Sequence, residues 1–255
     1  MINLLYPLPL SKICYNPQSS SKGVLMRKIP LDTLRTFDKD AISILSPKRL
    51  EGYEGSIERH YENLFLAFQS GKRIATLEIY LRNKLDFCLR EIEGEDWIKS
   101  EKSLCLIKQK THIPLPALYP HQILSSLMFG ELIGLINAYG IKHYMFDLRD
   151  FDFRKYHWSN RNYGYINGKK VAFSNIDKNA IVLNLIRNIR NRAFHWENLF
   201  KVTKKDNGDI FPRLTHKENN STIGVMPEMI LEFLDDLIDC IGNEVIKECI
   251  RKGGC

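Results

Sequence analysis

The stretch KNAIVLNLIRNIRNRAFHW, residues 178–196, decides the fold that this sequence predicts. Its apolar residues recur at the three- and four-residue spacing of an α-helix, so one face of the predicted helix is apolar. At about 100° per residue, five side chains share that face. They are Val182, Leu185, Ile186, Ile189 and Ala193. We expect this face to pack on other helices, as in a helical bundle.

The opposite face of the predicted helix carries asparagines and a histidine where a solvated helix normally carries Glu and Lys. Asn184, Asn188, Asn191 and His195 follow one another on this face, and Arg187 flanks them. Asparagine is a poor helix former, but its amide both donates and accepts hydrogen bonds. The pattern therefore indicates a face that makes specific hydrogen bonds.

Helical periodicity continues on both sides of this segment. It predicts a helix from Ser56 that Gly71 interrupts, a second from Ile74 to Ile92, a third from His121 to Tyr139, and a last one from about Pro227 to about Ile250. The fold class that follows is mainly α, a single helical domain.

Two Asn-Gly pairs predict the β-structure of the chain. Asn167-Gly168 lies between two strand-like arms in residues 163–173, which is the strongest short hairpin signal in the sequence. Asn207-Gly208 indicates a second small hairpin or turn. The first hairpin belongs to an irregular, aromatic-rich insert at about residues 143–178. Residues 1–40 form an N-terminal arm or irregular lead-in, and residues 41–255 the helical domain.

The chain is basic, with 37 Lys and Arg against 30 Asp and Glu and a net charge of +7. Such a charge favours polyanions such as nucleic acid, although many basic proteins bind none. The segment from Gln122 to Ile141 is apolar, but Glu131 and Asn137 favour a buried helix over a membrane span. We therefore expect no membrane partner.

The cysteines and the N-terminus indicate a cytoplasmic protein. The six cysteines are scattered without a C-x-x-C pair, which favours reduced, mostly buried thiols over disulfides and excludes the usual zinc spacings. Residues 1–15 lack the features of a signal peptide. No residue pattern calls for a metal or a cofactor.

The densest chemistry lies in RNRAFHWENLF, residues 190–200. Arg190 carries a permanent charge that matches phosphate, and His195 can exchange a proton near neutral pH. Asn191 precedes His195 by four residues, so their side chains can meet on a helix. Arg190 lies about 140° around the helix from His195. The two converge only if the helix distorts near Phe194 or if a second copy of the chain supplies one of them.

These residues resemble the signature of the HEPN-domain ribonucleases, in which an arginine precedes a histidine by a few residues at the end of a helix. The extended form RNRAFHWENLF resembles the Abi-like (abortive infection) branch of that family. Leu77-Glu78-x-x-Leu81-Arg82-Asn83 is similar to the family's first core helix, and Met128-Phe129-Gly130-Glu131-Leu132 to its middle helix. Trp196 departs from the pattern, since a histidine or a small residue is more usual there.

The resemblance implies a HEPN-like bundle and a metal-independent endoribonuclease, of a toxin or phage-defence type. It implies a homodimer with the active site at its interface, RNA as substrate, and an antitoxin or regulatory RNA as a possible partner. Arg190, Asn191 and His195 are then the catalytic residues. His195 deprotonates the 2′-hydroxyl of RNA or protonates the leaving oxygen, which leaves a 2′,3′-cyclic phosphate and a 5′-hydroxyl.

Seven further residues are candidates for binding the substrate. Arg187 precedes the motif and Arg192 lies within it. Glu197 either orients His195 or pairs with a surface lysine, and Lys201 extends a phosphate track or keeps a turn soluble. Arg82 and Asn83 either line the same cleft as the motif or belong to a solvated face of their helix. Arg161 belongs to a basic, aromatic stretch that suits base stacking or simply packs its own loop.

Two other interpretations of the sequence stay open. The bundle could bind RNA, or act as an adaptor, without catalysis. Alternatively, Arg190 and His195 could only stabilise the carboxyl end of a helix through its dipole.

Overall fold

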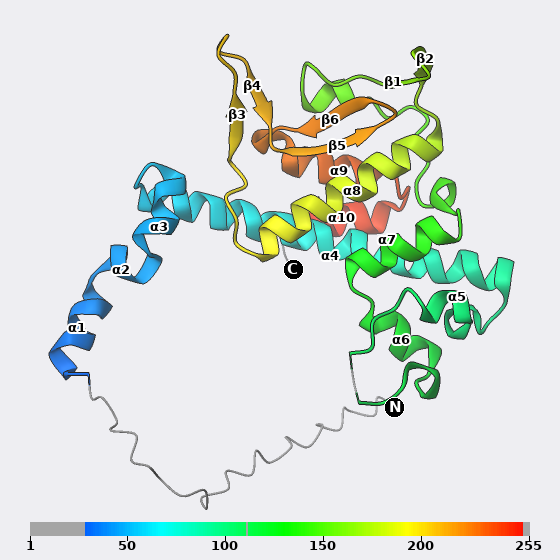
Figure 1. Cartoon of the computed structure of the whole chain (residues 1–255), viewed down its shortest axis with the longest axis horizontal. Coiled ribbons are helices and arrows are strands. Elements are labelled where there is room, and N and C mark those ends of the chain that lie inside the picture. The colour runs from blue at the N-terminus through cyan, green and yellow to red at the C-terminus, as the bar shows by residue number, and fades with distance from the viewer. Residues whose placement is uncertain (1–28, 111, 252–255) are drawn as a thin grey trace, which may run out of the picture. The chain divides into compact units, whose positions relative to one another are not determined.

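Helices α4 (Ile57–Glu93) and α8 (Asn175–Phe194) pack against each other in the computed structural model, which describes residues 29–110 and 112–251 (Figure 1). Helix α9 (Ile230–Asp239) packs on α4 as well. All five side chains of the predicted apolar face of α8 are buried, with at most 2% of their surface exposed. The prediction of a mainly α-helical fold is confirmed.

The chain divides into two compact units, Met1–Ser46 and Pro47–Cys255. The sequence predicts this boundary at about residue 40. Within the described part of the first unit, α1 (Leu31–Lys39) and α2 (Ala41–Leu45) are helical rather than irregular. The remainder of the predicted lead-in, residues 1–28, lies outside the described residues.

Helix α4 is continuous through Gly71, so the predicted interruption is wrong. A glycine in a helix costs about 1 kcal/mol relative to alanine. That cost is small compared with the free energy gained by burying the inward face of α4 on both sides of the glycine. Leu66 and Ala67 are buried before Gly71, and Ile74 and Leu77 after it. The apolar stripe keeps its phase across the glycine, and the helix follows the stripe.

Two predicted helices are each divided into two. The third becomes α6 (Pro120–Ser126) and α7 (Phe129–Ala138), because Met128 is extended and Glu131 accepts its N–H at 2.7 Å. Burial alone would raise the pKa of Glu131, but Lys110 and the N–H groups of Met128 and Lys108 outweigh it and lower that pKa. The last predicted helix becomes α9 and α10 (Glu244–Arg251), separated by Gly242 at φ +74°.

Three antiparallel hairpins complete the described fold. Strands β1 (Tyr163–Ile166) and β2 (Lys169–Ala172) meet at Asn167-Gly168, and β3 (Val202–Lys204) and β4 (Ile210–Pro212) are joined through Asn207-Gly208, as predicted. The sequence did not indicate the third, β5 (Leu214–Glu218) with β6 (Ser221–Val225). Its turn is Asn219-Asn220, both at positive φ, where asparagine is tolerated better than most residues.

The asparagines of α8 mostly bind backbone rather than line an open face. Asn179 is fully buried, and its amide bonds both the N–H and the carbonyl of Phe146. Asn188 donates to the carbonyl of Thr215 at 3.1 Å, which ties α8 to β5. The hydrogen-bonding face predicted from the sequence exists. Toward the amino end of α8, however, its side chains bond backbone groups of this protein.

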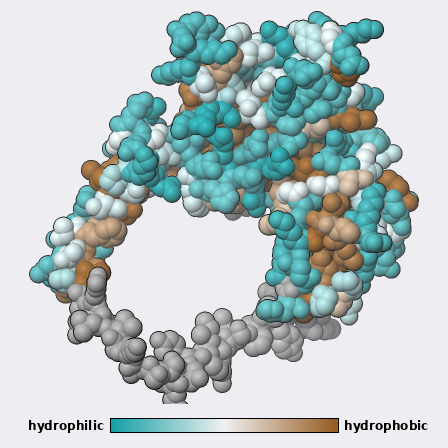
Figure 2. Space-filling view, in the orientation of Figure 1, coloured by the Kyte–Doolittle hydropathy of each residue, from teal (hydrophilic) through white to brown (hydrophobic). Residues whose placement is uncertain are grey.

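The shorter elements connect these parts. They are α3 (Pro47–Leu50), α5 (Glu101–Leu104), and the 3-10 turns Glu51–Tyr53, Trp97–Lys99, Leu115–Ala117, Lys142–Tyr144, Phe153–Tyr156 and Pro227–Met229. None of the described helices is both long enough and apolar enough to span a bilayer. In Figure 2 the visible surface over β3–β6 is mostly hydrophilic, whereas hydrophobic residues gather near α6 and α7.

The described cysteines form no disulfide, and the expectation that most thiols are buried is wrong for them. Cys88 is buried and Cys240 half-buried, whereas Cys105 and Cys249 are exposed. Cys14 and Cys255 lie outside the described residues.

Candidate functional site

The predicted motif lies where α8 ends. Phe194 is the last helical residue and His195 is the cap, while Trp196 adopts a left-handed conformation with φ +55°. The N–H of Trp196 bonds the carbonyl of Ala193, and the N–H of Glu197 bonds that of Arg192. These two bonds define a Schellman turn, a common way to end a helix, in which the left-handed position is usually glycine.

A tryptophan in that position is strained. The left-handed region costs a residue with a Cβ about 1–2 kcal/mol, so the surroundings must hold the turn in place. Arg49 donates to the carbonyl of Trp196 at 3.0 Å, and Asn198 donates to the carbonyl of Gly52. The segment after His195 is therefore tied to the chain just before α4.

Asn63 on α4 provides the most buried of these anchors. Its amide nitrogen donates to the carbonyl of Glu197 at 3.1 Å, and its amide oxygen accepts the N–H of Leu199 at 2.7 Å. Asn63 is fully buried. Its signal in the sequence is an asparagine at the inward phase of α4, a face that also buries His60 and Ser70, and the sequence analysis did not single it out.

His60 lies one turn before Asn63 on the same face of α4. It is buried, and neither ring nitrogen has a hydrogen-bond partner among the described residues. Its ring lies nearly perpendicular to the rings of Tyr53 and Tyr61 and in contact with both. Burial, and to a lesser extent the charge of Arg49, lower the pKa of His60. The imidazole is thus held neutral.

Arg190 meets Asn191 and Phe194 rather than His195. Its Nη1 makes a long hydrogen bond of 3.5 Å to Oδ1 of Asn191, and its guanidinium lies 5.2 Å from the centre of the Phe194 ring. The Nε atom is buried and has no partner within the described chain. The cation is therefore held along α8, with hydrogen-bonding capacity to spare.

The side chain of His195 is exposed and makes no hydrogen bond to any described residue. The expected hydrogen bond between Asn191 and His195 is not formed; only the backbone N–H of His195 bonds the carbonyl of Asn191. His195 leaves the helical region, with φ −96° and ψ +8°, but its N–H still makes the helical bond to the carbonyl of Asn191, so its place around the helix is kept. Within one chain, Arg190 and His195 therefore keep their separation of about 140° around the helix.

The flanking candidates differ in their surroundings. Arg187 is half-buried on α8 without an ion pair to the described residues, and Arg192 donates to the carbonyl of Arg213 at 3.5 Å. Glu197 is exposed, and its backbone rather than its carboxylate makes the anchoring contacts. Lys201 is exposed immediately before β3. These four residues lie on or beside the motif, and their role in binding substrate stays a prediction.

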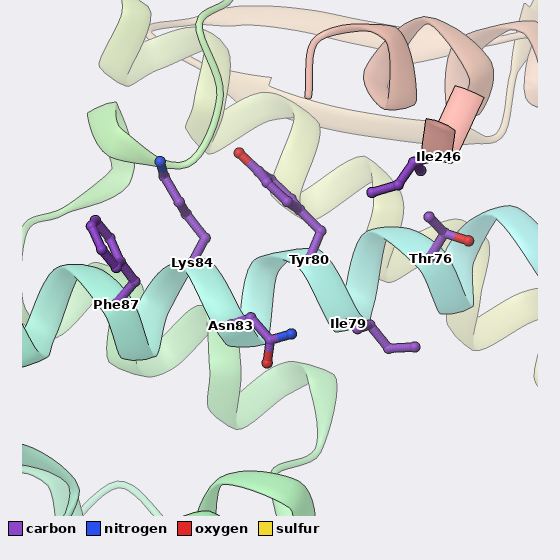
Figure 3. A pocket seen from close by; sticks show the side chains of 7 residues that line it. All are labelled: Thr76, Ile79, Tyr80, Asn83, Lys84, Phe87 and Ile246. Atoms are coloured by element: carbon purple, nitrogen blue, oxygen red, sulfur yellow. The ribbon is translucent and has the colours of Figure 1, made fainter. Parts of the chain in front are cut away.

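Arg82 and Asn83 are not brought to the motif. They follow Asn63 on α4 by 19 and 20 positions, which at 1.5 Å per residue places them about 30 Å away along the helix. Arg82 bonds Glu78 and the carbonyl of Leu127, where α6 ends. Asn83 lines a pocket of about 440 Å³ between α4 and α10 (Figure 3).

Arg161 stabilises its own loop. Its guanidinium donates to the carbonyls of Trp158, Ser159 and Asn160. Among the residues that the structure describes, no group of three or more His, Cys, Asp or Glu side chains is placed to hold a metal ion.

Comparison with known proteins adds no relative: no family model, no curated protein and no solved structure matches this chain.

Proposed function

We propose that this protein is a metal-independent endoribonuclease of the abortive-infection type, with its site at the carboxyl end of α8. The observation that carries the proposal is the exposed imidazole of His195, which makes no hydrogen bond to the described residues and follows the cationic Arg190 by five positions. The three predicted catalytic residues lie within six positions on a rigidly anchored helix end. Their residue types suit attack by the RNA 2′-hydroxyl.

In this mechanism His195 takes the proton of the 2′-hydroxyl or gives one to the leaving 5′-oxygen. Arg190 binds the scissile phosphate and stabilises the charge that develops on its oxygens. Asn191 holds the guanidinium through its Oδ1 and leaves its amide N–H groups for the phosphate. The products are a 2′,3′-cyclic phosphate and a 5′-hydroxyl, and DNA is not cut because it lacks the nucleophile.

The site is best completed by a second copy of the chain, because Arg190 and His195 point to different sides of one helix. Exposed aromatic side chains at this end of the molecule support such a dimer. Phe194 and Trp196 are 48% and 52% exposed. On α4, near Asn63, Tyr61, Phe65 and Phe68 are exposed as well. Burying such side chains contributes about 1.5–3 kcal/mol each.

The second candidate is an RNA-binding or adaptor protein without catalysis. It is favoured by one observation, that no described contact joins His195 to Arg190 or Asn191 through its side chain. In either case we propose a cytoplasmic protein, whose regulator would be an antitoxin or an RNA.

The test is RNA cleavage in EDTA by wild type, Arg190→Ala and His195→Ala. We expect each substitution to reduce the rate by about 10²–10⁴-fold. His121→Ala serves as the control, because His121 is exposed far along the chain from the motif. Equal cleavage by all four proteins would assign the activity to a contaminant. RNA binding without cleavage by wild type would favour the adaptor.

Mixing the two inactive variants tests the shared site. If Arg190 of one copy serves His195 of the other, each mixed dimer holds one intact site. Half of the dimers are then mixed, so about a quarter of the wild-type activity returns. A site contained within one chain would regain none.

A further inference from the structure

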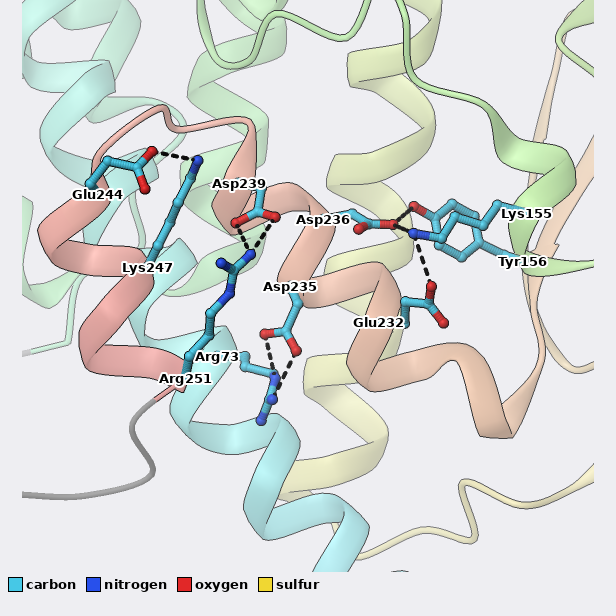
Figure 4. Close-up of polar contacts among 10 residues, drawn as sticks. All are labelled: Arg73, Lys155, Tyr156, Glu232, Asp235, Asp236, Asp239, Glu244, Lys247 and Arg251. Atoms are coloured by element: carbon cyan, nitrogen blue, oxygen red, sulfur yellow. Dashed lines mark hydrogen bonds and ion pairs between the residues drawn. The ribbon is translucent and has the colours of Figure 1, made fainter.

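The cations of this protein are distributed unevenly with respect to acids. Around α9 and α10 they are paired: Arg73 with Asp235, Lys155 with Glu232 and Asp236, Lys247 with Glu244, and Arg251 with Asp239 (Figure 4). Around the β3–β4 hairpin they are not. Lys201, Lys204, Lys205 and Arg213 form no ion pair with any described residue. Residues 201–213 hold these four cations and two acids, Asp206 and Asp209, so this segment keeps an excess of positive charge.

Trp158 is an exposed aromatic side chain beside this segment. It is 62% exposed, yet the loop that carries it is built rigidly. On one side of it, the buried His157 bonds Ser159 and the carbonyl of Ile210 in β4. On the other, the buried Asn160 bonds Phe153 and both backbone groups of Gly224. An exposed tryptophan on so fixed a support is preorganised to bind, because little order is lost on contact.

Phe211 of β4 flanks the tryptophan and carries a cation. The ring centres of Trp158 and Phe211 are 5.6 Å apart, and their planes are tilted by 56°. His157 is tilted against Trp158 by 44°. Neither neighbour lies flat on the indole, and most of its surface is exposed. The Nζ of Lys205 lies 4.1 Å from the centre of the Phe211 ring.

This cluster is connected to the motif at the end of α8. Arg192 bonds the carbonyl of Arg213, two residues beyond Phe211. Phe211 itself pairs with Thr203 on β3. Thr203 follows His195 by eight positions, which limits their separation to about 29 Å. The segment that follows the motif and includes Phe211, residues 201–213, carries four cations: Lys201, Lys204, Lys205 and Arg213.

We infer that Trp158, supported by the half-buried Phe211, forms a base-stacking platform for single-stranded RNA, with Lys205, Arg213 and Lys201 binding its phosphates. Aromatic faces next to unneutralised cations are the combination that binds single strands without reading their sequence. The choice of RNA rests on the proposed function. The platform makes no use of the 2′-hydroxyl, so single-stranded DNA binds it too, although it is not cut.

The experiment measures binding of a fluorescein-labelled 12-nucleotide uridine RNA in the His195→Ala background, which prevents cleavage. Trp158→Ala weakens binding by about 5- to 160-fold, as loss of one stacked base implies. Trp158→Phe retains most of the affinity because it keeps an aromatic face. Tyr119→Ala, an equally exposed aromatic outside the cluster, is the control and changes nothing. Lys205→Ala and Arg213→Ala each lower the salt slope by about 0.7.

An RNA of the same length with abasic positions separates stacking from charge. Trp158→Ala has no further effect on this strand if the indole stacks on bases. An equal loss on intact and abasic strands, or no loss on either, overturns the platform. So does a wild-type chain that binds no RNA at low salt.

The platform and the proposed function fail separately. If wild type binds RNA through Trp158 but never cuts it, the platform stands and the ribonuclease falls. If His195→Ala abolishes cleavage while Trp158→Ala binds normally, the ribonuclease stands and the platform falls.

Discussion

Asn63 on α4 accepts a hydrogen bond from the backbone N–H of Leu199 at 2.7 Å, across 136 positions of sequence. Together with its bond to the carbonyl of Glu197, this buried amide binds the segment that follows α8 as a neighbouring strand would. The strained turn at Trp196 lies between that anchor and the helix. The orientation of His195 is therefore set from both sides.

Replacing Asn63 by alanine removes one buried and one partly buried hydrogen bond and takes the partner away from two backbone groups. We expect the free energy of unfolding to fall by about 2–4 kcal/mol in urea denaturation, because each unpaired buried group costs about 1–3 kcal/mol. RNA cleavage, measured under conditions where the variant is folded, decreases as well. Asn184→Ala is the control, since the Asn184 amide only bonds a carbonyl of its own helix. Equal stability of the two variants would contradict the role of Asn63.

Trp196→Gly relieves the left-handed strain at the end of α8. Glycine adopts positive φ without the steric cost of a Cβ. We compare it with Trp158→Gly, which replaces a similarly exposed tryptophan at an ordinary φ. In urea denaturation we expect the free energy of unfolding of Trp196→Gly to exceed that of Trp158→Gly by at least about 1 kcal/mol. The opposite order would show that the Trp196 ring contributes more than its backbone costs.

His60→Phe replaces a buried imidazole, which has no hydrogen-bond partner in the described part of the chain, by an aromatic ring of similar size. At pH 7 we expect an increase in unfolding free energy of about 1–3 kcal/mol, the cost of burying unpaired polar atoms.

The gain from His60→Phe grows as the pH falls. The pKa of His60 is lowered in the fold, so below about pH 6.5 the unfolded chain binds the proton first and wild-type stability is lost. Urea midpoints at pH 7 and pH 5 measure the difference. His121→Phe, at an exposed histidine, is the control. A gain independent of pH would mean that His60 titrates normally in the fold.

Gly71→Ala is expected to stabilise the protein. Gly71 lies inside α4, and a Cβ there would meet no atom within 4 Å. The substitution gains about 0.5–1 kcal/mol of helix stability, seen as a higher urea midpoint. Gly164→Ala is the contrasting variant, because its Cβ would lie 2.4 Å from the carbonyl oxygen of Asn219. If alanine destabilised both positions equally, helix propensity would not govern α4.

Local patterns were sufficient where a signal and its consequence lie close together in the sequence. The apolar stripe of residues 182–193 fixes which face of α8 is buried, and Asn167-Gly168 positions the first hairpin. Both depend on backbone preferences and on burial within a few residues. The β5–β6 hairpin was not predicted, because Asn219-Asn220 is a weaker turn signal than Asn-Gly.

The sequence by itself determined a mainly helical chain with hairpins, and a motif in which Arg190 and His195 lie on different sides of a helix. Only the tertiary structure decided what surrounds that motif. It turned Asn188 toward β5, buried Asn63 against the segment after Trp196, and kept Arg82 about 30 Å along α4 from it. These outcomes depend on contacts between residues distant in sequence, and side chains alone do not reveal which distant backbone group they will bond.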